Sequence, residues 1–179
     1  VKGAPALGAA LAAVGIAVGK LALDAAEFGE MENAFKRLAI SQGASADQIL
    51  KKMKEASEGV LSQAEILKMA NEAMLAGIPI DNLEKITKIA KGAASSTGES
   101  ITTMMNSITN GLARGSTMML RHAGIVFDAE KVYEDYAKSV NKTVDQLSDA
   151  EKKQVFMNEA LKVGQQTLNT LGESQASAA

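Results

Sequence analysis

A recurring start signal for helices constrains this fold more than any other feature of the sequence. At five places a serine or threonine stands three residues before a glutamate or glutamine. At this spacing each side chain can accept a hydrogen bond from the backbone N–H of the other residue. The five pairs are Ser45 with Gln48, Ser62 with Glu65, Ser96 with Glu99, Thr143 with Gln146, and Ser148 with Glu151. Such closely spaced signals predict several short helices folded back on one another rather than one rod.

The residues between these signals support a helical bundle. Apolar residues recur there at three- and four-residue spacings, which is typical of helices with one buried face. We expect Asp81 to cap one of these helices and Gly92 to end it, before the helix that Ser96 opens. Aromatic residues make up only 3% of the chain while methionine occurs nine times, which favours helix packing over a β-sandwich or barrel. The sequence therefore predicts an all-α fold, with a bundle of short helices over Ser45–Leu171.

A long apolar stretch precedes this bundle. No charged residue stands between Lys2 and Lys20, and the following residues carry an amphipathic stripe. With no strong breaker between the two parts, they predict one N-terminal helix that is apolar first and amphipathic afterwards. We expect three parts: an N-terminal helix over residues 1–41, a compact helical body over 42–172, and a frayed tail over 173–179.

The apolar stretch permits two interpretations. Small residues at helical spacing provide a stripe for close helix packing, and they are Gly8, Ala12, Gly15 and Gly19. This favours a buried or self-associating helix. Membrane insertion is the alternative, because the run is close to spanning length, although glycine and alanine contribute little transfer free energy. A signal peptide fits less well, since its basic region would hold only Lys2.

An interrupted helix near the middle of the chain predicts an elbow. Gly124 breaks one helical run, three apolar residues follow, and Asp128 can cap the next helix. That helix carries Tyr133 and Tyr136 on one face, with charged residues around most of the rest. We expect the elbow to be buried and to join two packed helices.

The string from Leu120 to Leu161 resembles a segment of the tail tape measure proteins of long-tailed phages and prophages. The shared pattern is GI, then YxxYA, K-T, a leucine turn, EKKQ and NxxL. The matching positions are Gly124, Ile125, Tyr133, Tyr136, Ala137, Lys142, Thr143, Leu147, Glu151, Lys152, Lys153, Gln154, Asn158 and Leu161. These residues are helix caps and apolar anchors rather than catalytic groups.

The resemblance implies a structural role in the virion. A tape measure protein occupies the lumen of the tail tube, sets tail length and is released ahead of DNA at ejection. It implies assembly in the host cytoplasm as a small coaxial homo-oligomer, with tail tube proteins, tail tip proteins and tail assembly chaperones as partners. The host membrane is a further possible partner.

Few residues suggest catalysis or cofactor binding. The chain has no cysteine, which excludes disulfides and thiolate metal sites, and His122 is its only histidine. His122 fits a helix C-terminus better than a catalytic role. The pair Glu130 and Glu134 fits a solvated helix face better than a glycosidase dyad. We therefore expect no enzyme activity, no cofactor and no metal.

The net charge of −2 gives no reason to expect sequence-specific nucleic-acid binding. Four residues are candidates for partner contact, and they are Met118, Met119, Tyr133 and Tyr136. Packing within the chain is the simpler interpretation of both pairs. Two other functional classes remain open: a membrane-active helical bundle such as a pore former, and a helical adaptor module.

Overall fold

The computed structural model describes the backbone of residues 25–177 and the side chains up to Leu171. All regular secondary structure in this part of the chain is helical, and it begins with a helix over residues 25–41, called helix 25–41 below. The elements that follow are α2 (Ala46–Ala56), α3 (Gln63–Leu75), the 3-10 helix η1 (Ile80–Asn82), α4 (Leu83–Thr97), α5 (Ile101–Arg114), α6 (Thr117–Arg121), α7 (Ala129–Ser139), the 3-10 helix η2 (Val144–Gln146) and α8 (Asp149–Ser177).

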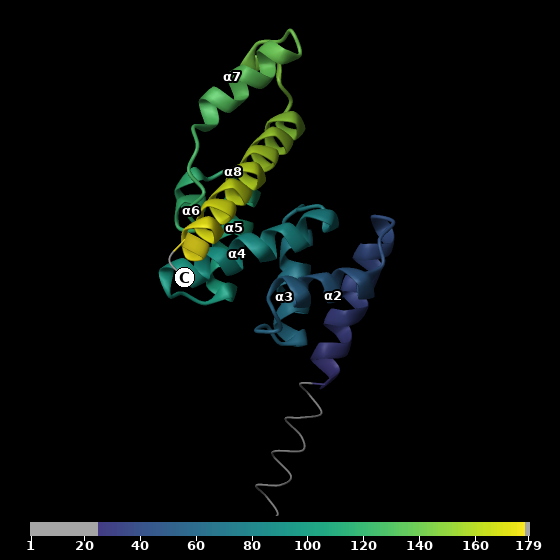
Figure 1. The fold of residues 1–179 in the computed structure, drawn as a ribbon. Helices are drawn as coiled ribbons and strands as arrows, with labels where there is room; N and C mark the ends of the chain where they lie inside the picture. The colour runs from purple at the N-terminus through teal and green to yellow at the C-terminus, as the bar shows by residue number, and fades with distance from the viewer. Residues whose placement is uncertain (1–24, 178–179) are drawn as a thin grey trace, which may run out of the picture.

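Helix α4 lies at the centre of this arrangement. It packs against α2, α5 and α8, while α7 packs against α8 and η2 (Figure 1). The all-α prediction is therefore confirmed for the described residues. One element departs from the prediction of uniformly short helices, because α8 is 29 residues long and continues to Ser177, through the segment expected to fray.

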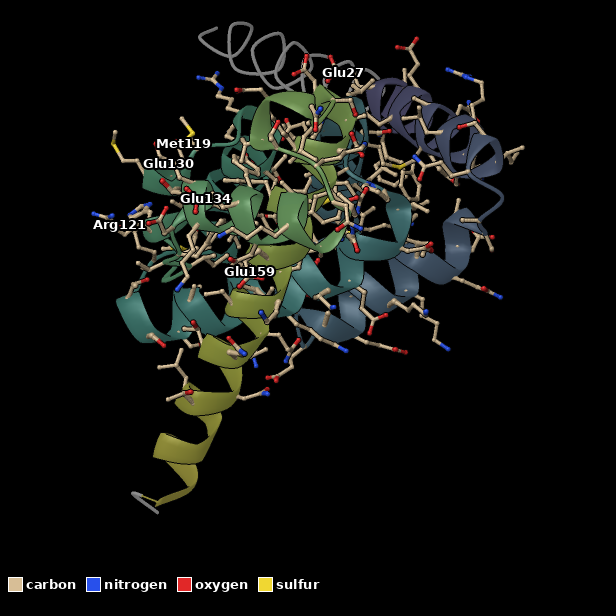
Figure 2. The ribbon with its side chains drawn as sticks, turned by 90° about the horizontal axis from the view of Figure 1, so that it is seen from above. Glu27, Met119, Arg121, Glu130, Glu134 and Glu159 are labelled. Carbon is tan, nitrogen blue, oxygen red and sulfur yellow. The ribbon has the colours of Figure 1, made fainter. Side chains whose placement is uncertain are left out.

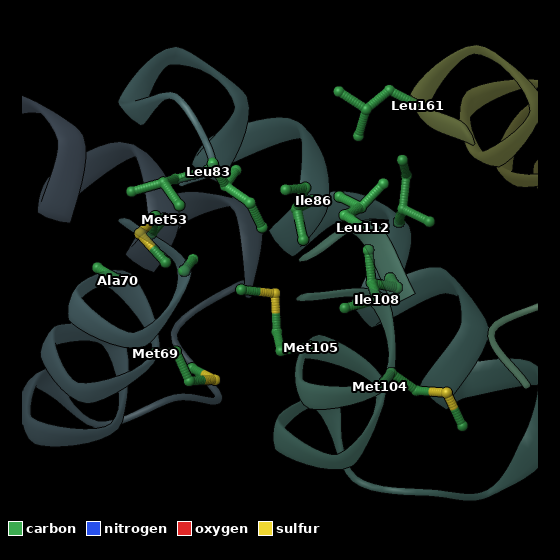
Figure 3. Close-up of a cluster of buried hydrophobic side chains, with 14 of the residues drawn as sticks. Met53, Met69, Ala70, Leu83, Ile86, Met104, Met105, Ile108, Leu112 and Leu161 are labelled. Carbon is green, nitrogen blue, oxygen red and sulfur yellow. The ribbon is translucent and has the colours of Figure 1, made fainter. Parts of the chain in front are cut away.

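The buried core explains the methionine-rich composition. Met53, Met104 and Met105 are fully buried between the helices, among leucine and isoleucine side chains (Figure 3). Unbranched methionine side chains can fill irregular spaces between helices that cross at different angles. Met104 and Met105 therefore fill the core of the bundle.

Predicted capping boxes form at Ser62, Thr143 and Ser148. At the start of α3 the Ser62 hydroxyl accepts a hydrogen bond from the Glu65 backbone N–H, and the Glu65 carboxylate accepts one from the Ser62 N–H. Ser148 and Glu151 form the same pair of bonds beside the start of α8. At η2, the Gln146 side chain accepts a hydrogen bond from the Thr143 N–H at 3.0 Å. Ser45 stands at the start of α2, but its side chain makes no cap hydrogen bond.

The predictions around α4 were wrong at both ends. Asp81 lies within η1, and Asn82 takes the position before α4. Gly92 does not end the helix, which runs to Thr97 and ends at Gly98 in a left-handed conformation. A Cβ atom at Gly92 would overlap the Leu168 side chain, so this glycine allows α8 to approach α4 closely.

The next helix begins later than predicted. Ser100, rather than Ser96, is the N-cap of α5, and its hydroxyl accepts a hydrogen bond from the Thr103 N–H. The Ser96 hydroxyl instead donates to the Gly92 carbonyl within α4. A serine three residues before an acid is therefore insufficient to start a helix where the preceding helix continues.

The elbow forms as predicted, with one exception. Gly124 has a φ of +72°, and the side chain of Ile125 is fully buried. Asp128 caps α7 by accepting hydrogen bonds from the N–H groups of Glu130 and Lys131. Val126, expected in the buried break, is instead 58% exposed.

Helix 25–41 belongs to the same core as the helices that follow it. Phe35 and Ala39 are fully buried in one continuous cluster with residues of α2 to α5 and α8. The predicted end at Ser41 is confirmed. The apolar part of the predicted N-terminal helix, with its stripe of Gly8, Ala12, Gly15 and Gly19, lies outside the described residues. Within residues 25–177, no helix is both long and apolar enough to cross a membrane.

Candidate interaction surfaces

The first candidate surface is a groove between α7 and α8. Only Ala137 of α7 is buried, so this helix covers α8 loosely and leaves a depression along the line where they meet. Phe127 and Tyr136 contribute aromatic surface to the groove, and Lys131, Asp135 and Glu159 contribute charges. The groove thus presents aromatic surface flanked by charges of both signs.

The two tyrosines of α7 have different surroundings. Tyr133 packs against the core cluster, and its burial raises the pKa of its phenol above the ordinary value. Tyr136 lines the groove instead. Tyr133 therefore follows the simpler interpretation of in-chain packing, while Tyr136 keeps a surface accessible to a partner.

A second candidate surface lies where α6 meets the elbow. Met118 is 79% exposed, whereas its neighbour Met119 is partly buried. A shallow depression beside α6 is lined by Thr117, Arg121, Val126, Phe127, Asp128, Ala129 and Glu130. Met119, Arg121 and Glu130 lie at one edge of the molecule in Figure 2. We call the surface of Met118, Arg121, Val126 and Glu130 the elbow face.

A third groove was not anticipated from the sequence. Helix 25–41 and α3 leave a depression between them that contains Met31, Ala34, Leu38 and the 77% exposed Leu75. Asn71 also lines it, and its side-chain N–H donates to the Met31 carbonyl at 2.9 Å. The Asn71 side-chain oxygen is buried without a hydrogen-bond partner among the described residues. Neither apolar periodicity nor capping signals indicate such a gap between helices.

His122 lies at the C-terminus of α6, as its position in the sequence suggested. Its Nδ1 lies 3.2 Å from the Ser107 hydroxyl, and no hydrogen bond joins the ring to a backbone carbonyl of the described residues. A serine–histidine pair acts as a nucleophile when a third group orients the imidazole and backbone donors stabilise an oxyanion. Among the described side chains, none forms a recorded hydrogen bond or ion pair with the other ring nitrogen of His122.

The acidic residues of α7 lie on its exposed side. Glu130 and Glu134 are both exposed, and the Glu134 carboxylate lies 3.7 Å from the Lys138 ammonium (Figure 2). In residues 25–171, no three histidine, aspartate or glutamate side chains group as metal ligands.

The strongest electrostatic cluster lies where η2 joins α8. The Glu151 carboxylate accepts hydrogen bonds from the Lys142 ammonium at 2.7 Å and from the Ser148 N–H at 2.8 Å. These bonds, with one from the Ser148 hydroxyl, lower the pKa of Glu151 to about 2. The cluster links the first turn of α8 to Lys142, which precedes η2.

No protein-family model matches the chain, and no solved structure matches it.

Proposed function

We propose that this chain is part of a tail tape measure protein of a long-tailed phage or prophage. In this role it occupies the tail tube lumen as a small coaxial homo-oligomer, contributes to setting tail length, and leaves ahead of DNA at ejection. Tail tube proteins, tail tip proteins and assembly chaperones are its partners. The proposal rests on the resemblance of the string from Leu120 to Leu161.

The observation that carries the proposal is the physical role of the matched residues. Gly124 and Ile125 form the elbow, Ala137 is buried in α7, and Leu147 is buried just after η2. Glu151 completes the capping box that Ser148 begins at the start of α8. The resembling string is thus one structural unit, a hairpin of α7, η2 and α8. Of the matched residues, Ile125, Ala137, Leu147 and Leu161 are buried, whereas Lys142, Thr143, Lys153, Gln154 and Asn158 are exposed.

Further matched residues attach this hairpin to the rest of the body. The Lys153 ammonium donates to the Ala76 carbonyl at the end of α3, and Leu161 is buried in the common core. Lys142 pairs with Glu151 at 2.7 Å. The string therefore supplies both the internal and the docking contacts of the hairpin, as expected for a structural module.

The compact shape of this body limits how much it can contribute to measuring tail length. An α-helix rises about 1.5 Å per residue, and folding helices back on one another shortens their span further. A compact body therefore acts as an assembly or release element, while extended helical chain would carry the measuring function.

The test is an in-frame deletion of residues 42–172 from the tail gene, followed by electron microscopy of tails and plating on the host. We expect tails of altered length or a loss of infectivity. Glu72→Gln, an exposed substitution on α3, is the matched control and should leave both unchanged. Tails of normal length with full infectivity after the deletion would exclude the structural role.

The self-association part of the proposal has its own test. Gly15→Asp would place a charge in the proposed close-packing stripe of small residues, where it should reduce the mass of the full chain measured by light scattering. If the oligomer mass is unchanged and wild-type chain instead causes leakage of liposomes, the membrane-active alternative gains.

A further inference from the structure

The elbow face combines exposed apolar surface with charges of opposite sign. Of its residues, Met118 is 79% and Val126 is 58% exposed. Arg121 and Glu130 line the same shallow depression, together with Val126. Methionine and arginine are among the residues enriched in protein interfaces. Met118 precedes Arg121 by three residues on α6, which places both side chains on one side of that helix.

The two charges of this face have no partner within the described part of the chain. Neither the Arg121 guanidinium nor the Glu130 carboxylate forms an ion pair with another described residue, although both line one depression. Asp128, which lines the same depression, accepts the cap hydrogen bonds of α7 through Oδ1. Arg121 and Glu130 therefore remain available to a docking molecule.

The arrangement of these groups indicates which kind of binding partner fits the elbow face. An anionic membrane would favour a uniformly basic patch, and an acidic peptide would favour the same. A two-fold interface brings the same patch of both copies together, so the patch must complement itself. If one residue of the patch contacts a second residue on the partner copy, that second residue makes the same contact in return. An arginine and a glutamate on one apolar face satisfy that requirement.

We propose that the elbow face is a contact between two copies of this chain, related by a two-fold axis, with Arg121 of each copy facing Glu130 of the other. Met118 and Val126 supply the apolar centre. Because the face is small, we place this contact among the weak, reversible interfaces. The inference stands apart from the tail role, since it uses only contacts of the folded body.

The first test uses the absence of native cysteine. A single cysteine is introduced at Met118 or Val126 in the full chain, and a short bis-maleimide cross-links neighbouring copies. Leu75→Cys, at a position 77% exposed on α3, is the matched control for accessibility and for oligomers formed through other parts of the chain. We expect dimer formation at Met118→Cys or Val126→Cys at least about tenfold faster than at Leu75→Cys. Equal rates at all three positions would overturn the proposal.

The second test is a charge exchange in the cross-linking variant. Arg121→Glu and Glu130→Arg each create two like-charge contacts in a symmetric pair, so each should slow cross-linking about tenfold. The double variant restores both opposite-charge contacts and should recover the original rate. Slow single variants without recovery in the double variant would exclude this pairing, and circular dichroism of each variant verifies the fold.

These outcomes are separate from those of the tail experiment. If the deletion of residues 42–172 alters the tails but the elbow face does not cross-link, the proposed tail role stands and the proposed dimer contact is wrong. If the elbow face cross-links rapidly but tails stay normal and infective after the deletion, the proposed dimer contact stands and the proposed tail role is wrong.

Discussion

Glycines inside helices have two different physical roles in this protein. A Cβ at Gly164 of α8 would lie 2.8 Å from Ile89 Cδ1, which is closer than real Cβ contacts, and 3.1 Å from Ile89 Cγ2, which is tighter than most of them. A Cβ at Gly29 of helix 25–41 would meet nothing within 4 Å among the described residues. Gly164 therefore permits close helix packing, whereas Gly29 only weakens its helix.

These two glycines make a matched pair for stability measurements. Alanine is favoured over glycine in helices by about 1 kcal/mol, so Gly29→Ala should raise the free energy of unfolding by roughly that amount. At Gly164→Ala, overpacking of about 1–3 kcal/mol opposes the gain, so the variant should be no more stable than the wild type. Urea unfolding measures both. An equal increase at the two sites would contradict the close approach of α8 to α4.

The Glu151 carboxylate predicts a defined dependence of stability on pH. Its pKa is about 2 in the folded protein against an ordinary value of 4.5, so its ionised form stabilises the fold above pH 4.5. That contribution is lost as the pH falls from 4.5 towards 2. Thermal unfolding should therefore show a smaller loss of Tm across this range for Glu151→Gln than for the wild type. The exposed variant Glu72→Gln should retain the wild-type slope.

At the scale of helices, capping explains which start signals stabilise the fold. Ser148→Ala removes a hydroxyl that accepts the Glu151 N–H at 3.2 Å and should lower the free energy of unfolding by about 1 kcal/mol. Ser45→Ala removes a side chain that makes no cap hydrogen bond and should change stability far less. Urea midpoints of the two variants test this ranking. A loss at Ser45→Ala as large as that at Ser148→Ala would show that the hydroxyl bond is not the cause.

The sequence correctly predicts those helix starts and turns that depend only on residues close together in the chain. The boxes at Ser62 and Ser148, the turn at Gly124 and the cap at Asp128 each involve residues a few positions apart, and all four form. The close approach of α8 to α4 at Gly92 involves Leu168, which is distant in sequence. A local pattern cannot distinguish a glycine that ends a helix from one that admits another helix.

The same reasoning applies to the candidate surfaces. The sequence identified Met118 and Tyr136 by residue type, and both have accessible surface. It grouped Met119 and Tyr133 with them, although Met119 is partly buried and Tyr133 packs against the core. Sequence reasoning did not connect Arg121 with Glu130, because only the folded elbow brings the two residues to one depression. Helical spacing places a residue on a face, and only the packing of helices decides which faces are covered.

At the scale of the whole molecule, one continuous core predicts cooperative unfolding. The only two tyrosines, Tyr133 and Tyr136, both lie on α7, whereas Phe35 is fully buried in helix 25–41. Phe35→Ala should lower the free energy of unfolding by about 3–5 kcal/mol. If the core is one unit, tyrosine fluorescence and far-ultraviolet circular dichroism should shift to the same lower urea midpoint. Separate midpoints would mean that the hairpin of α7 and α8 unfolds independently.

The position of α8 also determines how the body resists force. Helix α8 lies close to α4 at Gly92 and at Gly164. In its first turns, the Lys153 ammonium donates a hydrogen bond to the Ala76 carbonyl at the end of α3. These contacts follow one another along α8, so peeling this helix away from its C-terminal end would break the contact at Leu168 first, that at Gly164 next and that at Lys153 last.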